Sequence, residues 1–221
     1  MADALSNLPE ECPIDLAAIA ERRSWLLSYA RPGGIGAEFG VFRGHFAAVI
    51  ARELKPRKLF LVDPWTKSGE RFGWGPDPYT NFDRLTTAEA LRDTRHRMSP
   101  YESTCEIVYV EERLQDFARN FDTHSDKKLD FAYLDTSHTY EDTLEELRFL
   151  AEIVADDGVI LGDDWIPVIG HRHHGAMRAV NEFLKQSDYQ LVVAGQDAQW
   201  CLRRTPSYSD ATSRSVSDEI S

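Results

Sequence analysis

The chain has few cysteines and no long apolar run. Only three of its 221 residues are cysteine, and Cys12, Cys105 and Cys201 are widely spaced, which argues against a disulfide framework and against a thiolate zinc site. The longest apolar run, Phe46 to Ala51, has six residues, whereas a membrane helix needs about 20. The first residues lack a basic stretch followed by an apolar one, so we expect a cytoplasmic protein with no membrane span.

Basic residues are also in deficit. The chain has 25 lysines and arginines against 37 acidic residues, which gives a formal net charge of −12. Binding to nucleic acid or to an anionic membrane surface depends on a positive field, so this charge disfavours both partners. We therefore expect a small-molecule partner. Proline and glycine are at ordinary levels and 42% of residues are apolar, as in a globular domain.

Short apolar runs alternate with longer segments of helical periodicity between about residues 14 and 204. This pattern predicts an α/β fold, a Rossmann-like doubly wound sheet of seven strands with helices on both faces. Six strands would be parallel and one antiparallel, because only a few residues around 195–198 join the last two strands. We expect the strands at Ile35–Phe39, Lys58–Val62, Glu106–Val110, Leu129–Leu134, Val159–Leu161, Tyr189–Ala194 and Gln199–Arg203.

Two helices are well marked by their periodicity, His45–Leu54 and Tyr140–Ala155, and Asp157-Gly158 would stop the second. A third helix, at about Ile14–Ala30, is predicted before the sheet.

The chain divides into three parts. Residues 1–32 would form an N-terminal helical extension, which could cover the site or act as the arm of a homo-oligomer. Residues 33–204 would form the main domain. Residues 205–221 contain six serines and almost no large apolar side chains, which predicts a disordered tail.

A turn containing glycine follows the first strand and opens into a helix. Gly40 and Gly44 would let the backbone approach a ligand closely. The dinucleotide fingerprint G-x-G-x-x-G does not fit, because Glu38 stands at its first position and three residues separate Gly40 from Gly44. An acid at 38 suits a ligand with a positive amino group rather than a pyrophosphate. Asp63 ends the second strand, where a carboxylate can accept hydrogen bonds from two ribose hydroxyls.

The combination Glu38-x-Gly40-x-x-x-Gly44 with Asp63 resembles the cofactor site of class I S-adenosylmethionine-dependent methyltransferases, over about residues 33–204. The resemblance implies that Gly40 and Gly44 border the methionine moiety, that Glu38 helps to place its ammonium group and that Asp63 holds the ribose. The alternative is that the glycines only make a tight turn and that Asp63 only caps a loop.

The adenine contact should follow the third strand. Glu111, Glu112 and Arg113 are the residues in that place, and we take Glu112 as the candidate.

Three carboxylates follow two further strands. Asp135 ends the fourth strand, and Asp163 and Asp164 end the fifth. In a doubly wound sheet these strands are neighbours about 4.8 Å apart, and ligands bind beyond their carboxyl ends. Acids this close repel one another unless a cation neutralises them, and hard oxygen ligands select Mg²⁺, Ca²⁺ or Mn²⁺. The sequence therefore predicts a divalent metal site.

The segment Asp135-Thr-Ser-His138-Thr-Tyr-Glu, with the later Asp163-Asp164-Trp165, resembles metal-dependent O-methyltransferases of the macrocin and mycinamicin type, which act on sugar hydroxyls of natural products. The resemblance implies Asp135, Asp163 and Asp164 as ligands of Mg²⁺ and His138 as general base. In the alternative interpretation the aspartates are strand-end caps, and His138 is a turn residue before a helix that Thr139 caps.

The expected function is therefore S-adenosylmethionine- and metal-dependent O-methylation of a small molecule, on a sugar or polyol moiety in natural-product biosynthesis. A catechol-type methyltransferase is one alternative. Cephalosporin hydroxylases share the architecture, so oxidation is another. A non-catalytic cofactor-binding module with the same fold is a third.

Two loops lie outside these motifs. The segment 64–82 contains five aromatic residues, which suits a lid over the substrate or a dimer contact, and we favour the lid. His171-Arg172-His173-His174 is most simply a solvated loop at the mouth of the site, because adjacent histidines seldom converge on one ion.

Overall fold

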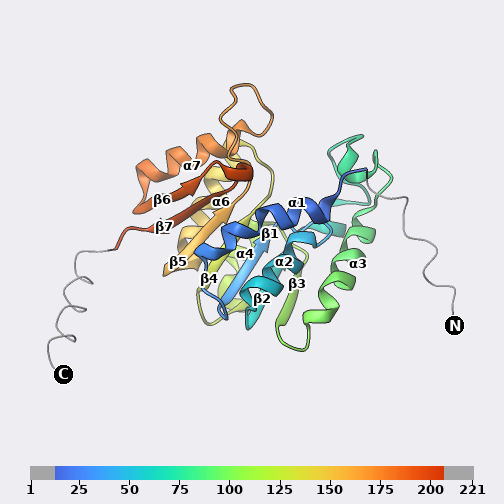
Figure 1. Ribbon diagram of the computed structural model, residues 1–221, viewed down its shortest axis with the longest axis horizontal. Helices are drawn as coiled ribbons and strands as arrows, with labels where there is room; N and C mark the ends of the chain where they lie inside the picture. The colour runs from blue at the N-terminus through green and yellow to red at the C-terminus, as the bar shows by residue number, and fades with distance from the viewer. Residues whose placement is uncertain (1–12, 207–221) are drawn as a thin grey trace.

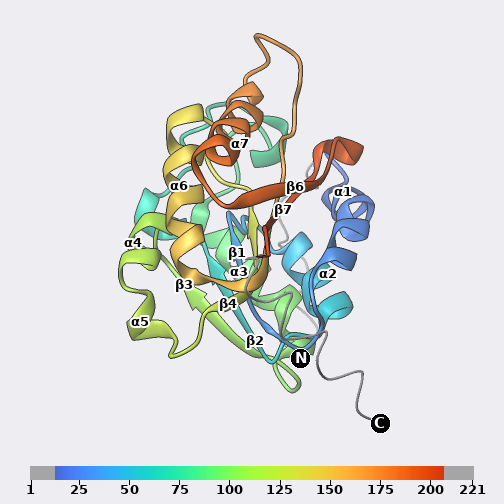
Figure 2. The same ribbon diagram turned by 90° about the vertical axis from the view of Figure 1, so that its left-hand side faces the viewer.

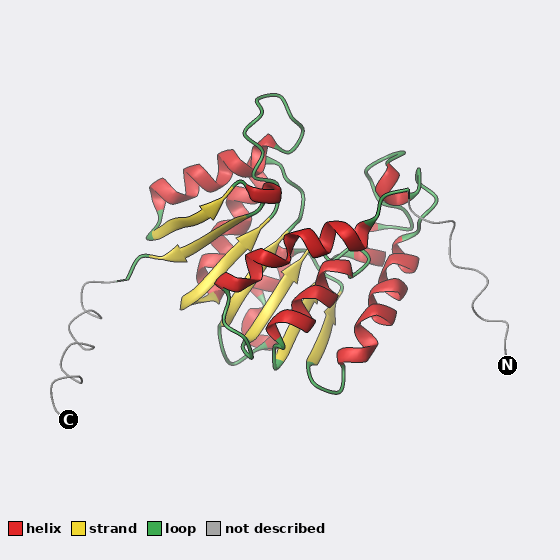
Figure 3. Cartoon of the chain, viewed as in Figure 1, coloured by secondary structure: helices red, strands yellow, loops and turns green. Residues whose placement is uncertain are grey.

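The computed structural model describes residues 13–206. A sheet of seven strands lies between two layers of helices, and the strand order is β3-β2-β1-β4-β5-β7-β6 (Figures 1 and 3). β7 runs antiparallel to both of its neighbours, whereas the other pairings are parallel. The predicted fold class is confirmed. The strands are β1 (Ile35–Phe39), β2 (Lys58–Val62), β3 (Glu106–Val110), β4 (Leu129–Leu134), β5 (Val154–Gly162), β6 (Tyr189–Ala194) and β7 (Trp200–Arg204).

The helices fill both faces of the sheet. Figure 2 shows α1 and α2 on one side and α4 and α6 on the other. The α-helices are α1 (Leu16–Arg23), α2 (His45–Leu54), α3 (Thr87–Met98), α4 (Leu114–Arg119), α5 (Phe121–His124), α6 (Tyr140–Ile153) and α7 (His174–Gln186). The 3-10 turns are η1 (Ser24–Tyr29), η2 (Trp65–Ser68), η3 (Pro78–Thr80), η4 (Ser99–Tyr101) and η5 (Gln196–Ala198).

Side chains alternate between the two faces along each strand, so the sheet separates two apolar cores. Leu59 and Leu61 of β2 pack in the core beneath α2, whereas Phe60 and Val62 pack in the core that contains α4 and α6. Leu26 and Leu27 of η1 are fully buried in the first of these cores. The N-terminal segment thus covers the α2 side of the sheet.

The register of the parallel strands aligns four strand ends. Phe39 pairs with Val62 on one side and with Leu134 on the other, and Leu134 pairs with Gly162. Ligands of doubly wound folds bind beyond this carboxyl edge. The next residues along each strand therefore lie together just past the edge: Gly40, Asp63, Asp135 and Asp163.

Some predicted boundaries are wrong. The helix predicted at Tyr140–Ala155 ends at Ile153, because β5 begins at Val154 and already pairs with β4 there. Asp157 and Gly158 lie inside β5 and do not stop the helix. The predicted helix Ile14–Ala30 is α1 followed by the tighter turn η1, which brings two adjacent leucines into the core.

Further sequence predictions concern termini, cysteines and membranes. Cys105 and Cys201 are buried free thiols, whereas Cys12 and the predicted tail from residue 207 onward lie outside the described residues. Between residues 13 and 206 no helix has the length and apolarity needed to cross a membrane.

Candidate active site

The turn after β1 passes very close to the end of β4. Gly40 and Gly44 have positive φ angles of 84° and 75°, which side chains rarely allow. A Cβ atom at Gly40 would lie 1.8 Å from the carbonyl oxygen of Asp135, and one at Gly44 would lie 2.9 Å from the Cα of Thr94. These contacts alone require glycine at both positions, so the glycines by themselves are not evidence of a cofactor.

Asp63 ties this turn to the loop that follows β2. Its two carboxylate oxygens accept the backbone N–H groups of Phe42, at 2.9 Å, and of Trp65, at 2.8 Å. Burial raises the pKa of Asp63 to about 6 in spite of these hydrogen bonds. A carboxylate can accept about four hydrogen bonds, so these contacts do not use its full capacity.

Glu38 is a buried carboxyl group near the end of β1. Its Oε2 atom has no hydrogen-bond partner among residues 13–206. Burial, followed by the charges of Asp135 and Asp63, raises the pKa of Glu38, and Arg23 opposes this. A cationic ligand such as an ammonium group would satisfy this atom, and the site therefore fits the amino end of the expected cofactor.

Glu111 and Glu112, the two acids that follow β3, contact different residues. The Oε2 atom of Glu112, the candidate for the adenine contact, lies 3.9 Å from Nε2 of His124 on α5. Glu111 accepts a hydrogen bond from the hydroxyl of Thr66, in the loop that starts at Asp63. The structure therefore links Glu111, and not Glu112, to the Asp63 loop.

The carboxylates that follow β4 and β5 meet at the edge of the sheet. Asp135, Asp163 and Asp164 each offer an oxygen atom, and these atoms lie within 4.8 Å of one another. Asp163 and Asp164 are buried, whereas Asp135 is half-buried. Such an arrangement needs a positive charge close by.

Arg23, the last residue of α1, supplies that charge. Its Nη1 atom lies 2.9 Å from Oδ2 of Asp135, and its Nη2 atom makes a still closer contact with Oδ2 of Asp163. Burial alone would lower the pKa of Arg23. The electrostatic interactions with Tyr133, Asp135 and Asp163 raise the pKa by more, so the guanidinium stays charged. Sequence reasoning missed this residue, because nothing in the sequence distinguishes Arg23 from Arg22.

Asp163 is positioned by Trp200 at the start of β7 and by Gln199, the residue before this strand. The side chain of Gln199, fully buried, donates from Nε2 to Oδ1 of Asp163 at 2.5 Å and accepts from the hydroxyl of Tyr133 at 2.9 Å. Trp200 donates its indole N–H to the carbonyl oxygen of Asp163 at 2.7 Å. Burial and the neighbouring Asp135 raise the pKa of Asp163, against the effect of Arg23.

Two imidazoles share the third carboxylate. Nδ1 of His138 lies 2.5 Å from Oδ2 of Asp164, and Nδ1 of His173 lies 2.8 Å from Oδ1. The two rings are stacked, with their centroids 4.4 Å apart. Burial opposes ionisation of Asp164, but His138 and His173 outweigh it and lower the pKa of the carboxyl group.

His138 is held with its second nitrogen toward the carboxylate cluster. Its Nε2 atom lies 3.8 Å from Oδ1 of Asp135. Burial lowers the pKa of His138, but the pairing with Asp164 and the charges of Asp135 and Asp163 outweigh burial, so the pKa is raised. The interpretation of residues 171–174 as a solvated loop is wrong for His173, because its ring is half-buried against His138 and Asp164.

The loop from 64 to 82 divides its aromatic residues between core and surface. Trp65 is fully buried and donates its indole N–H to the carbonyl oxygen of Phe42 at 2.8 Å. Phe72 is buried, whereas Trp74 and Phe82 are more than half exposed. The loop meets the segment before α7 through an ion pair between Asp77 and Arg172 at 3.3 Å.

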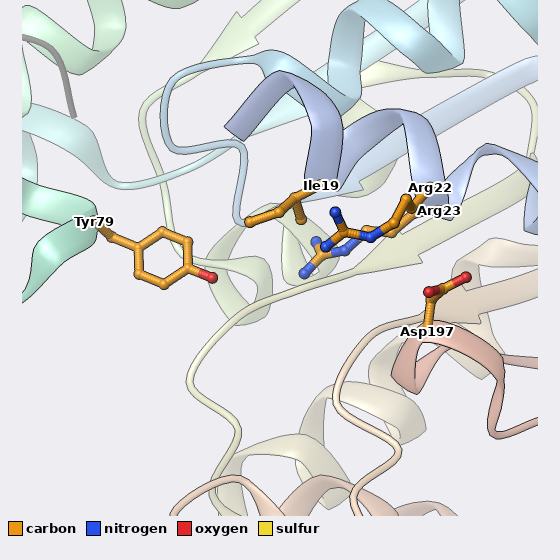
Figure 4. Close-up of a pocket in the computed structure, with 5 residues that line it drawn as sticks. All are labelled: Ile19, Arg22, Arg23, Tyr79 and Asp197. Atoms are coloured by element: carbon orange, nitrogen blue, oxygen red, sulfur yellow. The ribbon is translucent and has the colours of Figure 1, made fainter. Parts of the chain in front are cut away.

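A cavity of about 250 Å³ lies beside the carboxylate cluster. Figure 4 shows Tyr79 and Asp197 on opposite sides of it, with the side chains of α1 between them. Arg23 belongs both to this cavity and to the carboxylate cluster, so the two adjoin. The lining residues are Ile19, Arg22, Arg23, Tyr79 and Asp197.

Three solved structures illustrate the similarity of the fold. O-methyltransferase TomG from Streptomyces achromogenes, involved in tomaymycin synthesis and solved with S-adenosylmethionine, is 15% identical, with 86% of this chain and 79% of that chain covered and a TM-score of 0.55. CalS11, a TDP-rhamnose 3′-O-methyltransferase of calicheamicin biosynthesis, is 19% identical, with 86% and 78% covered and a TM-score of 0.54. A putative rRNA methylase from Clostridium thermocellum is 15% identical, with 85% and 96% covered and a TM-score of 0.56.

Sequence comparison gives the family. No curated protein sequence matches the chain. A family model described as a methyltransferase domain matches residues 37–165, more than half of the chain, and this range contains the residues of the glycine turn and all three clustered aspartates. The structural neighbours share the class I methyltransferase fold. The chain belongs to the methyltransferase-domain family.

Proposed function

We propose that the chain is a cytoplasmic S-adenosylmethionine-dependent O-methyltransferase that acts on a hydroxyl group of a small molecule. The observation that supports this most strongly is the alignment of three features along one sheet edge: Glu38, Asp63 and the carboxylate cluster with its neighbour His138. Oε2 of Glu38 is buried and has no hydrogen-bond partner among residues 13–206. This is the edge at which ligands of doubly wound folds bind.

The cofactor half of the site consists of Glu38 and Asp63. Glu38 would pair with the ammonium group of S-adenosylmethionine, and Asp63 would accept hydrogen bonds from the ribose hydroxyls. Gly40 and Gly44 would keep the intervening turn close to the ligand. When bound, the cofactor supplies an electrophilic methyl group. Glu112 stays the candidate for the adenine contact, with Glu111 as the acid nearer the Asp63 loop.

The carboxylate cluster fits a divalent cation, which we take to be Mg²⁺. Asp164 would share its carboxylate between the ion and the two imidazoles, since Nδ1 of His138 lies 2.5 Å from its Oδ2 atom and Nδ1 of His173 lies 2.8 Å from its Oδ1 atom. Asp135, Asp163 and Asp164 would be the ligands, because hard oxygen donors suit this class of ion. A bound ion would supply Lewis acidity toward the acceptor hydroxyl.

His138 would act as the general base. Its Nε2 atom would take the proton of the acceptor hydroxyl, and Asp164 would stabilise the resulting imidazolium through Nδ1. The cavity that Tyr79 and Asp197 line would hold the acceptor beside the carboxylate cluster. Positioning of this kind and the exclusion of water supply much of the rate enhancement of group transfer.

The cavity suits a sugar or polyol moiety. Its lining offers two guanidinium groups, a phenol hydroxyl and a carboxylate, with one aliphatic side chain. Such polar groups bind hydroxyl-rich ligands through hydrogen bonds. TomG is involved in tomaymycin synthesis and CalS11 in calicheamicin biosynthesis, which supports the same setting here. The net charge of −12 opposes an RNA substrate, although one protein of similar fold is a putative rRNA methylase.

The test is transfer of a labelled methyl group from S-adenosylmethionine to a panel of sugars, nucleotide sugars, catechols and RNA, with Mg²⁺ or with a chelator. We expect label in a sugar or polyol hydroxyl, and loss of transfer with the chelator. Label in RNA alone would contradict the small-molecule acceptor. Cofactor binding without transfer to any acceptor would instead favour a non-catalytic module.

A further inference from the structure

We propose that Arg23 is the resident counter-cation of the carboxylate cluster and that a divalent ion displaces it. Arg23 and the ion would be alternative occupants of one site, and binding of the ion would release the end of helix α1 from the carboxylates. This inference rests on the proposed metal site.

The contacts of Arg23 are with two of the proposed ligands. Its two terminal nitrogens meet one oxygen each of Asp135 and Asp163, across more than a hundred residues of sequence. The Arg23 side chain is 19% exposed, that of Asp135 is 23% exposed and that of Asp163 is 5% exposed. Partly buried ion pairs of this kind are screened much less by salt than exposed pairs.

The two cations exclude each other for electrostatic reasons. Arg23 already contacts Oδ2 of both Asp135 and Asp163, so an ion bound between these two carboxylates would meet the guanidinium group. A guanidinium and a divalent ion on the same oxygen atoms would repel each other strongly at such short range. A bound ion would therefore require Arg23 to leave.

Displacement of Arg23 would change the acceptor cavity. Arg23 is the last residue of α1, and Ile19, Arg22 and Arg23 of this helix form one wall of the cavity (Figure 4). The ion pairs of Arg23 link that wall to the ends of β4 and β5. Once they are broken, the cavity can open toward the carboxylates that would bind the ion.

The chain offers a matched control in Arg22. It lies next to Arg23 on α1 and is exposed, and within residues 13–206 no ion pair involves it. Its removal takes the same charge from the same helix without freeing a carboxylate.

The test is Mn²⁺ binding, followed by the electron paramagnetic resonance signal of the free ion, in wild-type chain, Arg23→Ala, Arg23→Gln and Arg22→Ala. We expect both Arg23 variants to bind Mn²⁺ at least about tenfold more tightly than wild type, and Arg22→Ala to stay within about twofold. We also expect Mn²⁺ to speed amide hydrogen exchange in residues 16–23 of the wild-type chain.

Three results would overturn the inference. Equal or weaker Mn²⁺ binding by the Arg23 variants would show that Arg23 does not compete, and absence of binding by all four chains would show that no shared site exists. Equal tightening by Arg22→Ala would show a long-range charge effect. A parallel titration with S-adenosylhomocysteine separates these failures from failure of the proposed methyltransferase function, because the cofactor residues are untouched in all four chains.

Discussion

The imidazole of His138 lies 2.5 Å through Nδ1 from the carboxylate of Asp164, and both residues have positive φ angles, 60° and 63°. Residues with side chains rarely adopt this conformation, which costs roughly 1–3 kcal/mol at each position. Such strained residues cluster at functional sites. The contact leaves Nε2 of His138 as the ring nitrogen that faces Asp135 and is available to an acceptor.

Replacement of His138 by alanine should lower kcat by roughly 100-fold or more, because general base catalysis contributes at least that much. Binding of S-adenosylhomocysteine should not change, since His138 lies outside the cofactor half of the site. The measurement is steady-state kinetics with the acceptor that the wild-type chain methylates. His96→Ala, on an exposed face of α3, is the control. Full activity of His138→Ala would remove the histidine from the base role.

Cofactor affinity should depend on the ionisation of Asp63. Burial raises its pKa to about 6, and the ionised carboxylate is the better acceptor for ribose hydroxyls. Affinity for S-adenosylhomocysteine should therefore fall as the pH is lowered through 6, and Asp63→Asn should weaken binding and flatten this part of the pH profile. Calorimetric titrations at several pH values measure both effects. The exposed Asp122→Asn is the control, and an unchanged profile in Asp63→Asn would contradict the assignment.

Replacement of Gly40 by alanine should destabilise the fold by about 3 kcal/mol or more, because a Cβ atom would lie 1.8 Å from the carbonyl oxygen of Asp135 at a positive φ angle. Gly73 is the control, since an added Cβ there meets nothing within 4 Å and its φ angle is ordinary. Urea unfolding of the two variants measures the difference. Equal stability of Gly40→Ala and Gly73→Ala would refute the close packing of this turn.

The buried carboxyl group of Glu146 should make the free energy of unfolding depend on pH. Burial raises its pKa from 4.5 to about 7, against the hydrogen bond that it accepts from the Thr136 hydroxyl at 2.6 Å. The folded state therefore binds this proton more tightly than the unfolded state, and stability falls as the pH rises from about 4.5 to about 7, by about 3 kcal/mol at most.

Glu146→Gln should remove this cost and keep an acceptor for Thr136. The gain in unfolding free energy should be about 2 kcal/mol larger at pH 8 than at pH 5. Urea unfolding at both pH values measures it. An equal gain in unfolding free energy at the two pH values would show that burial does not raise the pKa of Glu146.

The sheet and its acids were predictable, because short apolar runs that end in a carboxylate mark the edge at which parallel strands align. Asp135 and Asp163 come together for that reason alone. The end of α6 was not predictable, because Val154 and Ala155 continue the helical periodicity although they start β5. Periodicity cannot distinguish a buried helix end from the first residues of a buried strand.

Arg23 and His173, which contact the clustered aspartates, were hidden from sequence reasoning for a different reason. Arg23 stands beside Arg22 at the end of a helix, where basic residues are favoured by the helix dipole. His173 stands in a run of polar residues that looks like a solvated loop. Which of these side chains turns inward depends on how α1 and the segment before α7 pack on the sheet, and no local pattern encodes that packing.

If this sheet edge binds S-adenosylmethionine through Glu38 and Asp63, calorimetric titration with S-adenosylhomocysteine should show it in the wild-type chain and in Glu38→Gln. We expect one binding site per chain and at least about tenfold weaker binding in Glu38→Gln, because a buried charge-assisted contact with the ammonium group is lost. No binding to the wild-type chain, or equal binding to both chains, would contradict it.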